Sequence, residues 1–315
     1  NVEKIDKDRI GVIWGAGIGG LETFQNEVLG FASGNGTPRF NPFMIPKMIP
    51  DIAPGIISIR NGFRGPNFAT VSACASSSNA IIDGLNYIRL GYADVIVSGG
   101  SEAGVSISGI GGFNAMMALS TRNDDPKTAS RPFDKDRDGF VMGEGGGAIV
   151  VEEYEHALSR GAKIYAELVG YGATSDGFDM VQPSGEGAVR CMQQSMQNIG
   201  KIDYLNTHGT STPVGDSREL EAIKETFGED IPKLTSTKSL TGHSLGVAGV
   251  HEAIYTLLML DSDFIAASAN IENLDEGAKG VPIVTAMEEG IGLNTVMSNS
   301  FGFGGTNASL VFTKP

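Results

Sequence analysis

Two periodicities of apolar residues alternate along the 315-residue chain. Short continuous runs rich in Val and Ile are typical of strands buried on both faces of a sheet. Apolar residues at three- and four-residue spacing are typical of amphipathic helices. The runs predict strands over residues 93–100, 146–153, 163–172, 201–209, 295–302 and 307–313, and the spaced pattern predicts helices over 78–91, 186–200, 216–228 and 246–260. Strands interleaved with helices indicate an α/β protein with layered architecture.

No linker or low-complexity segment divides the chain, so we interpret it as two halves that share one core. A helical pattern over residues 154–163 closes the first half. We therefore place the first half at residues 1–161 and the second at 162–315. A chain of this length is long enough to bury a substantial core.

Composition narrows the class of protein. Two cysteines cannot form a disulfide framework, so a cytoplasmic location is expected. No apolar run approaches the ~20 residues that span a bilayer, and the polar start, residues 1–11, lacks the pattern of a signal peptide. The net charge of −14 argues against general nucleic-acid binding, yet it leaves room for an acidic partner on a local basic patch.

The glycines of GAGIGG, residues 15–20, pose a question because Gly15, Gly17 and Gly20 have the spacing of a dinucleotide-binding turn. That motif also requires a carboxylate at the end of a second strand about 20 residues further on. Residues 30–55 are instead Pro-rich and loop-like, without such a strand. A bend where the backbone passes close to another segment is therefore the favoured interpretation.

Cys74 follows the strand-like segment 67–72 and begins a helix. A thiol near the positive end of a helix dipole has its thiolate form favoured, and the small neighbouring residues leave room for a substrate. A lone cysteine is nevertheless more often a buried structural residue. Cys191 fits that description, since it lies on the apolar face of a helix, and we assign it to the core.

Two of the four histidines occupy positions that suit chemistry. His208 ends a strand, and His243 lies in a Gly-rich turn that enters a helix, five residues after Lys238. Strand ends and helix N-termini are where α/β proteins place reactive groups. His156 and His251 fall inside helical patterns and are expected to be solvated or packed. No histidine pair has metal-ligand spacing and no CxxC occurs, so no zinc site is expected.

The segment SNSFGFGGTNASLVF, residues 298–312, alternates two phenylalanines with glycines. Gly302, Gly304 and Gly305 allow positive φ, which can present an amide to a developing oxyanion. A plain hairpin turn with two core aromatic residues fits the same pattern. A cysteine with a histidine suits acyl transfer through a thioester, and a second histidine suits stabilisation of a charge beside a carbonyl.

Four motifs, SACASSSNAI, NTHGTSTPVGD, TKSLTGHSLGVAG and NSFGFGGTNASLVF, resemble in order and spacing the β-ketoacyl-[acyl-carrier-protein] synthases of fatty-acid synthesis. The resemblance covers essentially the whole chain but not the family's N-terminal portion, which places the polar start in mid-domain. The sequence is closer to type II enzymes up to about Ala162 and closer to type I beyond it. The resemblance implies a thiolase-like α-β-α-β-α fold of two similar halves and a cytoplasmic homodimer.

The same resemblance implies a decarboxylative Claisen condensation of an acyl-enzyme thioester with malonyl-carrier. The partner is the acyl carrier protein, whose phosphopantetheine brings the substrate, and no metal or organic cofactor is required. Cys74 is the implied nucleophile, and His208 and His243 hold the malonyl thioester carbonyl and stabilise its enolate. Lys238 fixes charge and geometry around the two histidines.

Further roles follow from matching positions in the family. The backbone amides of Cys74 and Phe303 correspond to the oxyanion hole. The expected substrate-binding residues are Ile18 at the floor of the acyl pocket, Phe140, Thr210 and Thr212 along the pantetheine tunnel, and the gate residue Phe301, which shares this role with Phe303. Glu219 and Glu252 are expected as buried supporting carboxylates, and Arg39 and Lys47 as carrier-docking residues.

Three alternatives stay open. The chain could be an inactive fragment or a non-condensing partner subunit of the same family, although such subunits usually lack the cysteine present here as Cys74. It could be a thiolase-like or type III relative acting on coenzyme A esters, although His243 argues against this. A dinucleotide-binding protein is supported only by residues 15–20.

Overall fold

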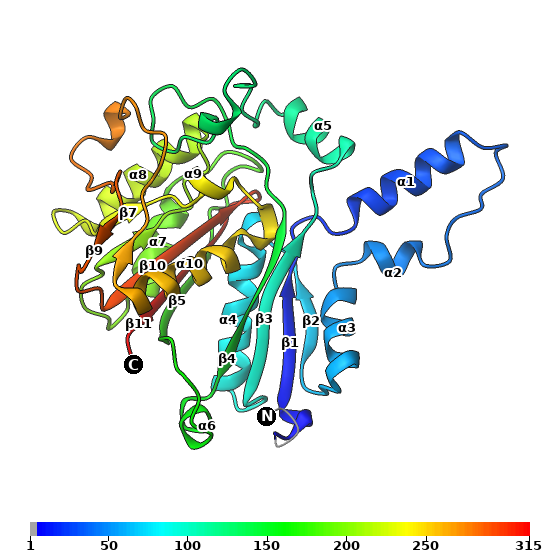
Figure 1. Ribbon diagram of the computed structural model, residues 1–315, viewed down its shortest axis with the longest axis horizontal. Helices are drawn as coiled ribbons and strands as arrows, with labels where there is room; N and C mark the ends of the chain where they lie inside the picture. The colour runs from blue at the N-terminus through cyan, green and yellow to red at the C-terminus, as the bar shows by residue number, and fades with distance from the viewer. Residues whose placement is uncertain (1–4) are drawn as a thin grey trace.

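Two β-sheets organise the molecule, and a computed structural model describes residues 5–315 (Figure 1). Residues 1–4 of the predicted polar start lie outside the described part. The first sheet has the order β2–β1–β3–β4, in which β4 is antiparallel to β3 and the other pairs are parallel. Its strands are β1 (Ile10–Gly15), β2 (Asn67–Thr70), β3 (Val95–Glu102) and β4 (Gly145–Glu152).

The second sheet has the order β5–β11–β10–β6–β7. Strands β10, β6 and β7 run parallel, whereas β11 is antiparallel to both β10 and β5. Its strands are β5 (Glu167–Ser175), β6 (Tyr204–Asn206), β7 (Lys233–Thr235), β10 (Thr295–Gly302) and β11 (Thr306–Thr313). In each sheet, the parallel strands are thus followed by an antiparallel neighbour at one side. The predicted boundary between the two halves, at residues 161/162, falls between β4 and β5.

Helices form three layers around the two sheets (Figure 1). Helices α4 (Ser76–Arg89) and α10 (Ala248–Ser262) lie between the sheets, α3 (Ile52–Asn61) covers the first sheet, and α7 (Glu186–Ser195) and α8 (Pro213–Phe227) cover the second. The central core joins Ile81 and Ile82 of α4 to Val250 of α10 and to Val296 and Leu310 of the second sheet. The layered α-β-α-β-α arrangement expected from the sequence is therefore present.

Helices α1 (Leu21–Ala32) and α2 (Met44–Met48) form an arm that projects from the body (Figure 1). The loop-like interpretation of residues 30–55 was wrong for α2 and for the start of α3. Pro46 and Pro54 lie in the first turns of these helices, where a missing N–H breaks no helical hydrogen bond.

Short elements complete the chain. They are α5 (Ile107–Ala115), α6 (Tyr154–Ser159), α9 (Lys238–Thr241), β8 (Phe264–Ile265), β9 (Glu288–Glu289) and the 3-10 turns Lys7–Arg9, Ala73–Ala75, Pro126–Thr128, Leu245–Val247 and Glu276–Ala278. Within residues 5–315, no helix has the length and apolar character to cross a bilayer.

Candidate active site

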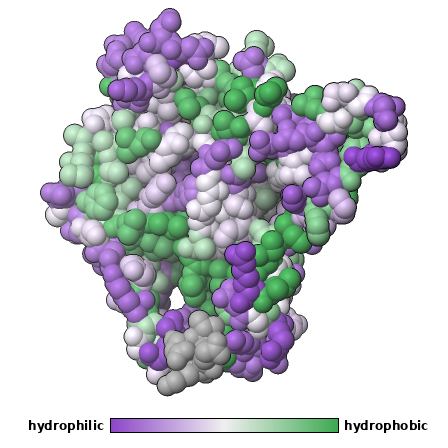
Figure 2. All heavy atoms as spheres, turned by 45° about the vertical axis from the view of Figure 1, so that its right-hand side comes forward, coloured by the Kyte–Doolittle hydropathy of each residue, from purple (hydrophilic) through white to green (hydrophobic). Residues whose placement is uncertain are grey.

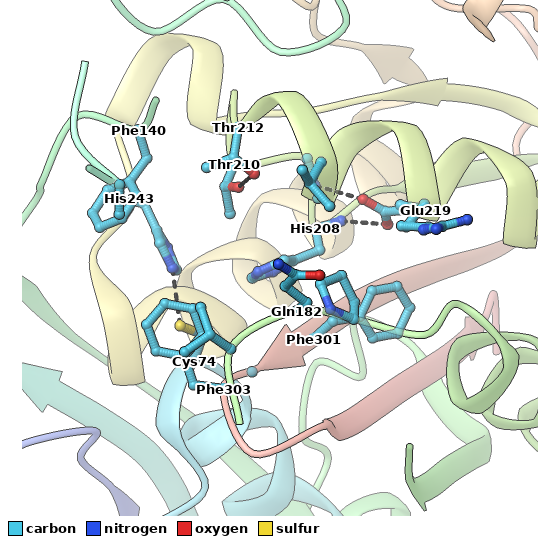
Figure 3. A pocket seen from close by; sticks show the side chains of 18 of the residues that line it. Cys74, Phe140, Gln182, His208, Thr210, Thr212, Glu219, His243, Phe301 and Phe303 are labelled. Carbon is cyan, nitrogen blue, oxygen red and sulfur yellow. Dashed lines mark hydrogen bonds between the residues drawn. The ribbon is translucent and has the colours of Figure 1, made fainter. Parts of the chain in front are cut away.

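Cys74 lies on a tight turn between β2 and α4, at the end of the parallel strands. The preceding residue, Ala73, has a φ of 49°, a left-handed conformation that costs energy outside glycine. The Ser76 hydroxyl holds the turn by accepting from the Ser72 N–H at 2.9 Å and donating to the Ala73 carbonyl at 2.7 Å. The turn presents the buried Cys74 sulfur to a cavity between the two halves (Figure 3).

The thiol of Cys74 is protonated in this resting geometry. Burial raises its pKa to about 12, which outweighs the lowering by the Lys238 ammonium and by the hydrogen bond from the Phe303 backbone N–H. Desolvation of the buried sulfur thus opposes the thiolate form that the helix dipole is expected to favour. The Phe303 backbone N–H donates to the sulfur, and the oxyanion-hole role expected of it stays a prediction.

His243 approaches Cys74 from the second half, and its Nε2 lies 3.0 Å from Sγ. Its backbone N–H donates to the Val141 carbonyl at 2.7 Å, and its carbonyl accepts from the Gly143 N–H at 2.9 Å. The Phe140 ring packs edge-on against the imidazole with 5.3 Å between centroids. The backbone bonds hold the turn that carries the ring and Phe140 packs against it, while its buried Nδ1 has no partner among residues 5–315.

His208 follows β6 and faces His243, with ring centroids 5.3 Å apart and planes at 89°. Glu219 of α8 holds this turn by accepting from the backbone N–H groups of His208 and Gly209, at 2.7 and 2.6 Å. Burial and the Lys238 ammonium hold the pKa values of both His208 and His243 well below 6.5. Both imidazoles are therefore neutral at pH 7.

Lys238 is almost fully buried beneath the histidines. Its Nζ forms an ion pair with Glu252 and donates to the His208 carbonyl at 2.6 Å, and it lies 3.5 Å from His208 Nδ1. Burial raises the pKa of Glu252 to about 7 against the opposing effect of Lys238, and burial likewise raises the pKa of Glu219 to about 7. The two predicted supporting carboxylates thus contact the histidine turn and the lysine.

The Gly-rich segment forms the hairpin that joins β10 to β11. Gly304 and Gly305 have φ values of 80° and 70°, as predicted, but Gly302 does not have a positive φ. Gly302 is required for a different reason, since a Cβ there would lie 2.9 Å from the Ser72 carbonyl and 3.0 Å from the Cys74 nitrogen. The hairpin therefore packs directly against the cysteine turn.

The turn at residues 15–20 follows β1 and precedes α1, as in a dinucleotide fold, but its amides are occupied. The N–H groups of Gly17, Ile18 and Gly19 all donate to the Glu102 carboxylate. A Cβ at Gly15 would lie 2.4 Å from the Ser77 nitrogen, and one at Gly20 would lie 2.5 Å from the Lys47 carbonyl. These glycines serve close packing, so the dinucleotide interpretation is wrong.

Comparison with known proteins places this geometry in a family. The model described as "Beta-ketoacyl synthase, N-terminal domain" matches residues 1–157, and "Beta-ketoacyl synthase, C-terminal domain" matches residues 165–272. The chain belongs to the beta-ketoacyl synthase family. The chain is 53% identical to 3-oxoacyl-[acyl-carrier-protein] synthase 1 of Haemophilus influenzae, a match that covers 99% of this chain and 77% of that protein.

Other beta-ketoacyl synthases match over the same extent. The 3-oxoacyl-[acyl-carrier-protein] synthase 2 of Staphylococcus aureus is 47% identical, with 98% of this chain and 75% of that protein covered. The solved beta-ketoacyl synthase of Burkholderia phymatum superposes with a TM-score of 0.92 at 37% identity, covering 99% of this chain and 77% of that chain. The thiolase-like fold expected from the motifs is thereby confirmed.

The cavity of this synthase encloses about 370 Å³ and brings most of the predicted site residues together (Figure 3). The Thr210 and Thr212 hydroxyl oxygens lie 3.0 Å apart on its wall. The predicted residues in its lining are Cys74, Phe140, His208, Thr210, Thr212, Glu219, His243, Phe301 and Phe303. Ile18 is 41% exposed and does not line this cavity, and Arg39 and Lys47 lie exposed on and beside the α1–α2 arm.

Several lining residues were not identified from the sequence. They include Phe113, Met116 and Met117 in and after α5, and also Gln182 and Arg218. The sequence signal that could have identified the first three is the largely apolar composition of α5. The ligating atoms of Cys74, His208 and His243 also lie within 4.8 Å of one another, close enough to reach one metal ion. The neighbouring Lys238 ammonium disfavours a cation there.

Proposed function

We propose that this synthase elongates fatty-acyl chains by decarboxylative Claisen condensation of an acyl group on Cys74 with a malonyl thioester. The observation that carries the proposal is the 3.0 Å contact between Cys74 Sγ and His243 Nε2, with the neutral His208 ring facing the same space. Relatives at 47–53% identity carry the name 3-oxoacyl-[acyl-carrier-protein] synthase, which supports the proposal.

Acyl transfer comes first. The Cys74 sulfur attacks the thioester carbonyl carbon of the incoming acyl group, and the carbonyl oxygen takes up the negative charge. The backbone N–H groups of Cys74 and Phe303 stabilise this oxyanion. The carbon–sulfur bond of the incoming thioester then breaks, and the departing thiolate takes the proton that Cys74 loses. The acyl group remains as a thioester on Cys74.

Condensation follows when a malonyl thioester binds. The Nε2–H groups of His208 and His243 donate to its thioester carbonyl, which requires both rings to be neutral, as burial makes them. The bond to the carboxylate breaks, CO₂ leaves, and the electron pair forms an enolate. The enolate carbon attacks the acyl carbon on Cys74, a carbon–carbon bond forms, and the cysteine sulfur leaves as a thiolate that takes up a proton from water.

We propose an acyl carrier protein as the partner that delivers both thioesters on phosphopantetheine. A solved complex at 28% identity and TM-score 0.93 is described as a type II PKS acyl-carrier protein with its ketosynthase. The lining threonines Thr210 and Thr212 suit the amide groups of a pantetheine arm, and Arg39 and Lys47 suit an acidic carrier. The proposed chemistry uses no metal or organic cofactor.

We also propose a cytoplasmic homodimer. The edge strand β2 pairs on one side only, and the neighbouring α1–α2 arm exposes apolar side chains. Leu29 is 55% and Phe43 is 64% exposed, and Ile59 of α3 is 81% exposed. Figure 2 shows further apolar residues at the surface of the molecule. Exposed apolar patches are typical of an interface.

The test is intact-protein mass after incubation with a medium-chain acyl-carrier, followed by addition of malonyl-carrier. We expect one acyl adduct that Cys74→Ala abolishes and the control Cys191→Ala retains. Malonyl-carrier should then discharge the adduct as a β-ketoacyl product, and His208→Ala or His243→Ala should block this discharge. Acylation without discharge in the wild-type chain would favour a non-condensing partner subunit and overturn the proposal.

A further inference from the structure

Glu102, the last residue of β3, is a buried carboxylate whose described hydrogen-bond partners are all backbone amides. Its Oε2 accepts from the N–H groups of Gly17 at 2.6 Å and Gly246 at 3.1 Å, and its Oε1 accepts from those of Ile18 and Gly19, each at 3.2 Å. Its exposed fraction is 5%. Hydrogen bonds to an ionised acceptor are stronger than neutral ones, so the carboxylate fixes these four amides together.

The two segments that Glu102 joins belong to different halves of the molecule. Residues 17–19 follow β1 of the first half, whereas Gly246 lies in the Leu245–Val247 turn of the second half. A Cβ on Gly246 would lie only 2.1 Å from the Gly17 nitrogen. The two backbones thus pass as closely as glycines allow, and the Glu102 carboxylate bridges them at this point.

Each joined segment adjoins one partner of the reactive pair. A Cβ on Gly17 would lie 3.3 Å from the carbonyl oxygen of Ala73, the residue before Cys74. Gly246 follows His243 by three residues, through Leu245, which is held at a φ of 57° and lines the cavity. A shift between residues 17 and 246 would therefore move the cysteine turn relative to the histidine turn.

We propose that Glu102 is a positioning residue that sets the contact between Cys74 and His243 by fastening the two halves beside them. It is absent from the lining of the cavity, so it acts through the two turns rather than on the substrate. This inference rests on the proposed function, because its kinetic readout is acyl transfer to Cys74. The arrangement also explains why Gly17 and Gly246 are glycines.

The charge of Glu102 and its positioning role have opposite effects on the thiol. Among the smaller influences on the Cys74 pKa, the Glu102 carboxylate raises it. Removing the charge without moving the sulfur would therefore make the thiol more reactive. Loss of the positioning by Glu102 predicts slower acyl transfer. The direction of the change in rate therefore distinguishes the positioning role from the effect of the charge.

The test compares Glu102→Gln with Glu153→Gln. Glu153 is a matched control because its carboxylate also accepts a backbone N–H, that of His156 at 2.6 Å. It follows β4 at the end of the first sheet where Glu152 pairs with Val95, whereas Cys74 follows the opposite end of β2. Glutamine keeps the shape of Glu102 but turns an NH₂ group towards amide donors. We expect single-turnover acyl transfer to fall at least tenfold in Glu102→Gln and less than twofold in Glu153→Gln, with alkylation of Cys74 by iodoacetamide at pH 7 as fast as or faster than in wild type.

Gly246→Ala is the second variant, because its added methyl group forces residues 17 and 246 apart while Glu102 stays intact. We expect it to reproduce the defect in acyl transfer. Acyl transfer within twofold of wild type in folded Glu102→Gln and Gly246→Ala would overturn the positioning role. Wild-type chain that fails to form the acyl adduct would instead overturn the proposed function, so the two failures are distinct.

Discussion

Lys238 and Glu252 form an ion pair in which each side chain is only 2% exposed. The pair lies directly beneath His208, whose carbonyl also accepts from the lysine. A charge in this position is stable only while its partner remains, because neither group can reach water. The ion pair therefore joins the stability of the second half to the electrostatics of the reaction.

Lys238→Met should destabilise the protein strongly, since it leaves the Glu252 carboxylate buried without its partner. We expect a loss of about 3–5 kcal/mol in the free energy of unfolding, measured by urea titration. The matched control is Lys163→Met, which removes an ion pair with Asp261 at 2.9 Å whose lysine is 59% exposed. That pair should contribute less than about 1 kcal/mol, so equal losses in the two variants would contradict the prediction.

Glu219→Gln should change how stability depends on pH. Burial raises the pKa of Glu219 from its ordinary value of 4.5 to about 7, so the folded state holds this proton more tightly than the unfolded state. Its contribution to stability is therefore full below pH 4.5 and is lost as pH rises through 7. We expect the Tm difference between Glu219→Gln and wild type to move in favour of the variant from pH 5 to pH 8.

The control for this pH experiment is Glu221→Gln on the same helix. Glu221 is 64% exposed and pairs with Arg218 at the surface. Its Tm difference from wild type should stay constant over the same pH range. A parallel pH response in both variants would show that the buried position of Glu219 is not the cause.

Alanine at the two hairpin glycines should give two different results. Gly304 has a φ of 80° with open space around its missing Cβ, so Gly304→Ala should cost only the left-handed backbone penalty of about 1–2 kcal/mol. Gly305 has a φ of 70°, and a Cβ there would lie 2.7 Å from the Cβ of Asp176. Gly305→Ala should therefore be less stable than Gly304→Ala by urea unfolding and should also slow acyl transfer, because the hairpin must shift beside Cys74.

Charge reversal at Arg39 and Lys47 should weaken binding of an acidic carrier. We expect the double variant Arg39→Glu and Lys47→Glu to raise KM for acyl-carrier severalfold with little change in kcat, and salt should reduce the difference. Arg60→Glu is the control, being another exposed arginine in the first half but in the last turn of α3, at the end away from the arm. An unchanged KM in the double variant would show that the carrier docks elsewhere.

Turnover should not depend on a metal ion. The Lys238 ammonium lies 3.5 Å from His208 Nδ1, and it disfavours a cation between the two histidines and Cys74. We expect the rate of condensation to be unchanged after dialysis against EDTA. A loss of rate that Zn²⁺ or Mg²⁺ restores would contradict this prediction.

The pattern of the sequence predicted the long elements well because their burial is regular. Helices α4, α7, α8 and α10 and most strands coincide with predicted segments. The strands β7, β8 and β9, each of two or three residues, were not predicted. Helices α2 and α3 were missed because the prolines in their first turns are typical of loops.

The sequence identified the reacting residues of the site but not the residue that positions them. Cys74, His208, His243 and Lys238 stood out because reactive side chains occur at strand ends and turns. Glu102 was not identified, because its role depends on backbone amides that lie 83–85 and 144 residues away in the sequence. The protonated state of the Cys74 thiol also escaped prediction, since burial is a property of the assembled halves.

The contact between Cys74 and His243 joins residues 169 positions apart. Such a contact closes a very long loop, and topology of this kind slows folding. During synthesis at about 5–20 residues per second, roughly 10–30 s separate the emergence of the cysteine from that of its histidine. The newly made thiol therefore has neither its imidazole nor its buried surroundings, and it acquires both only when the second half docks.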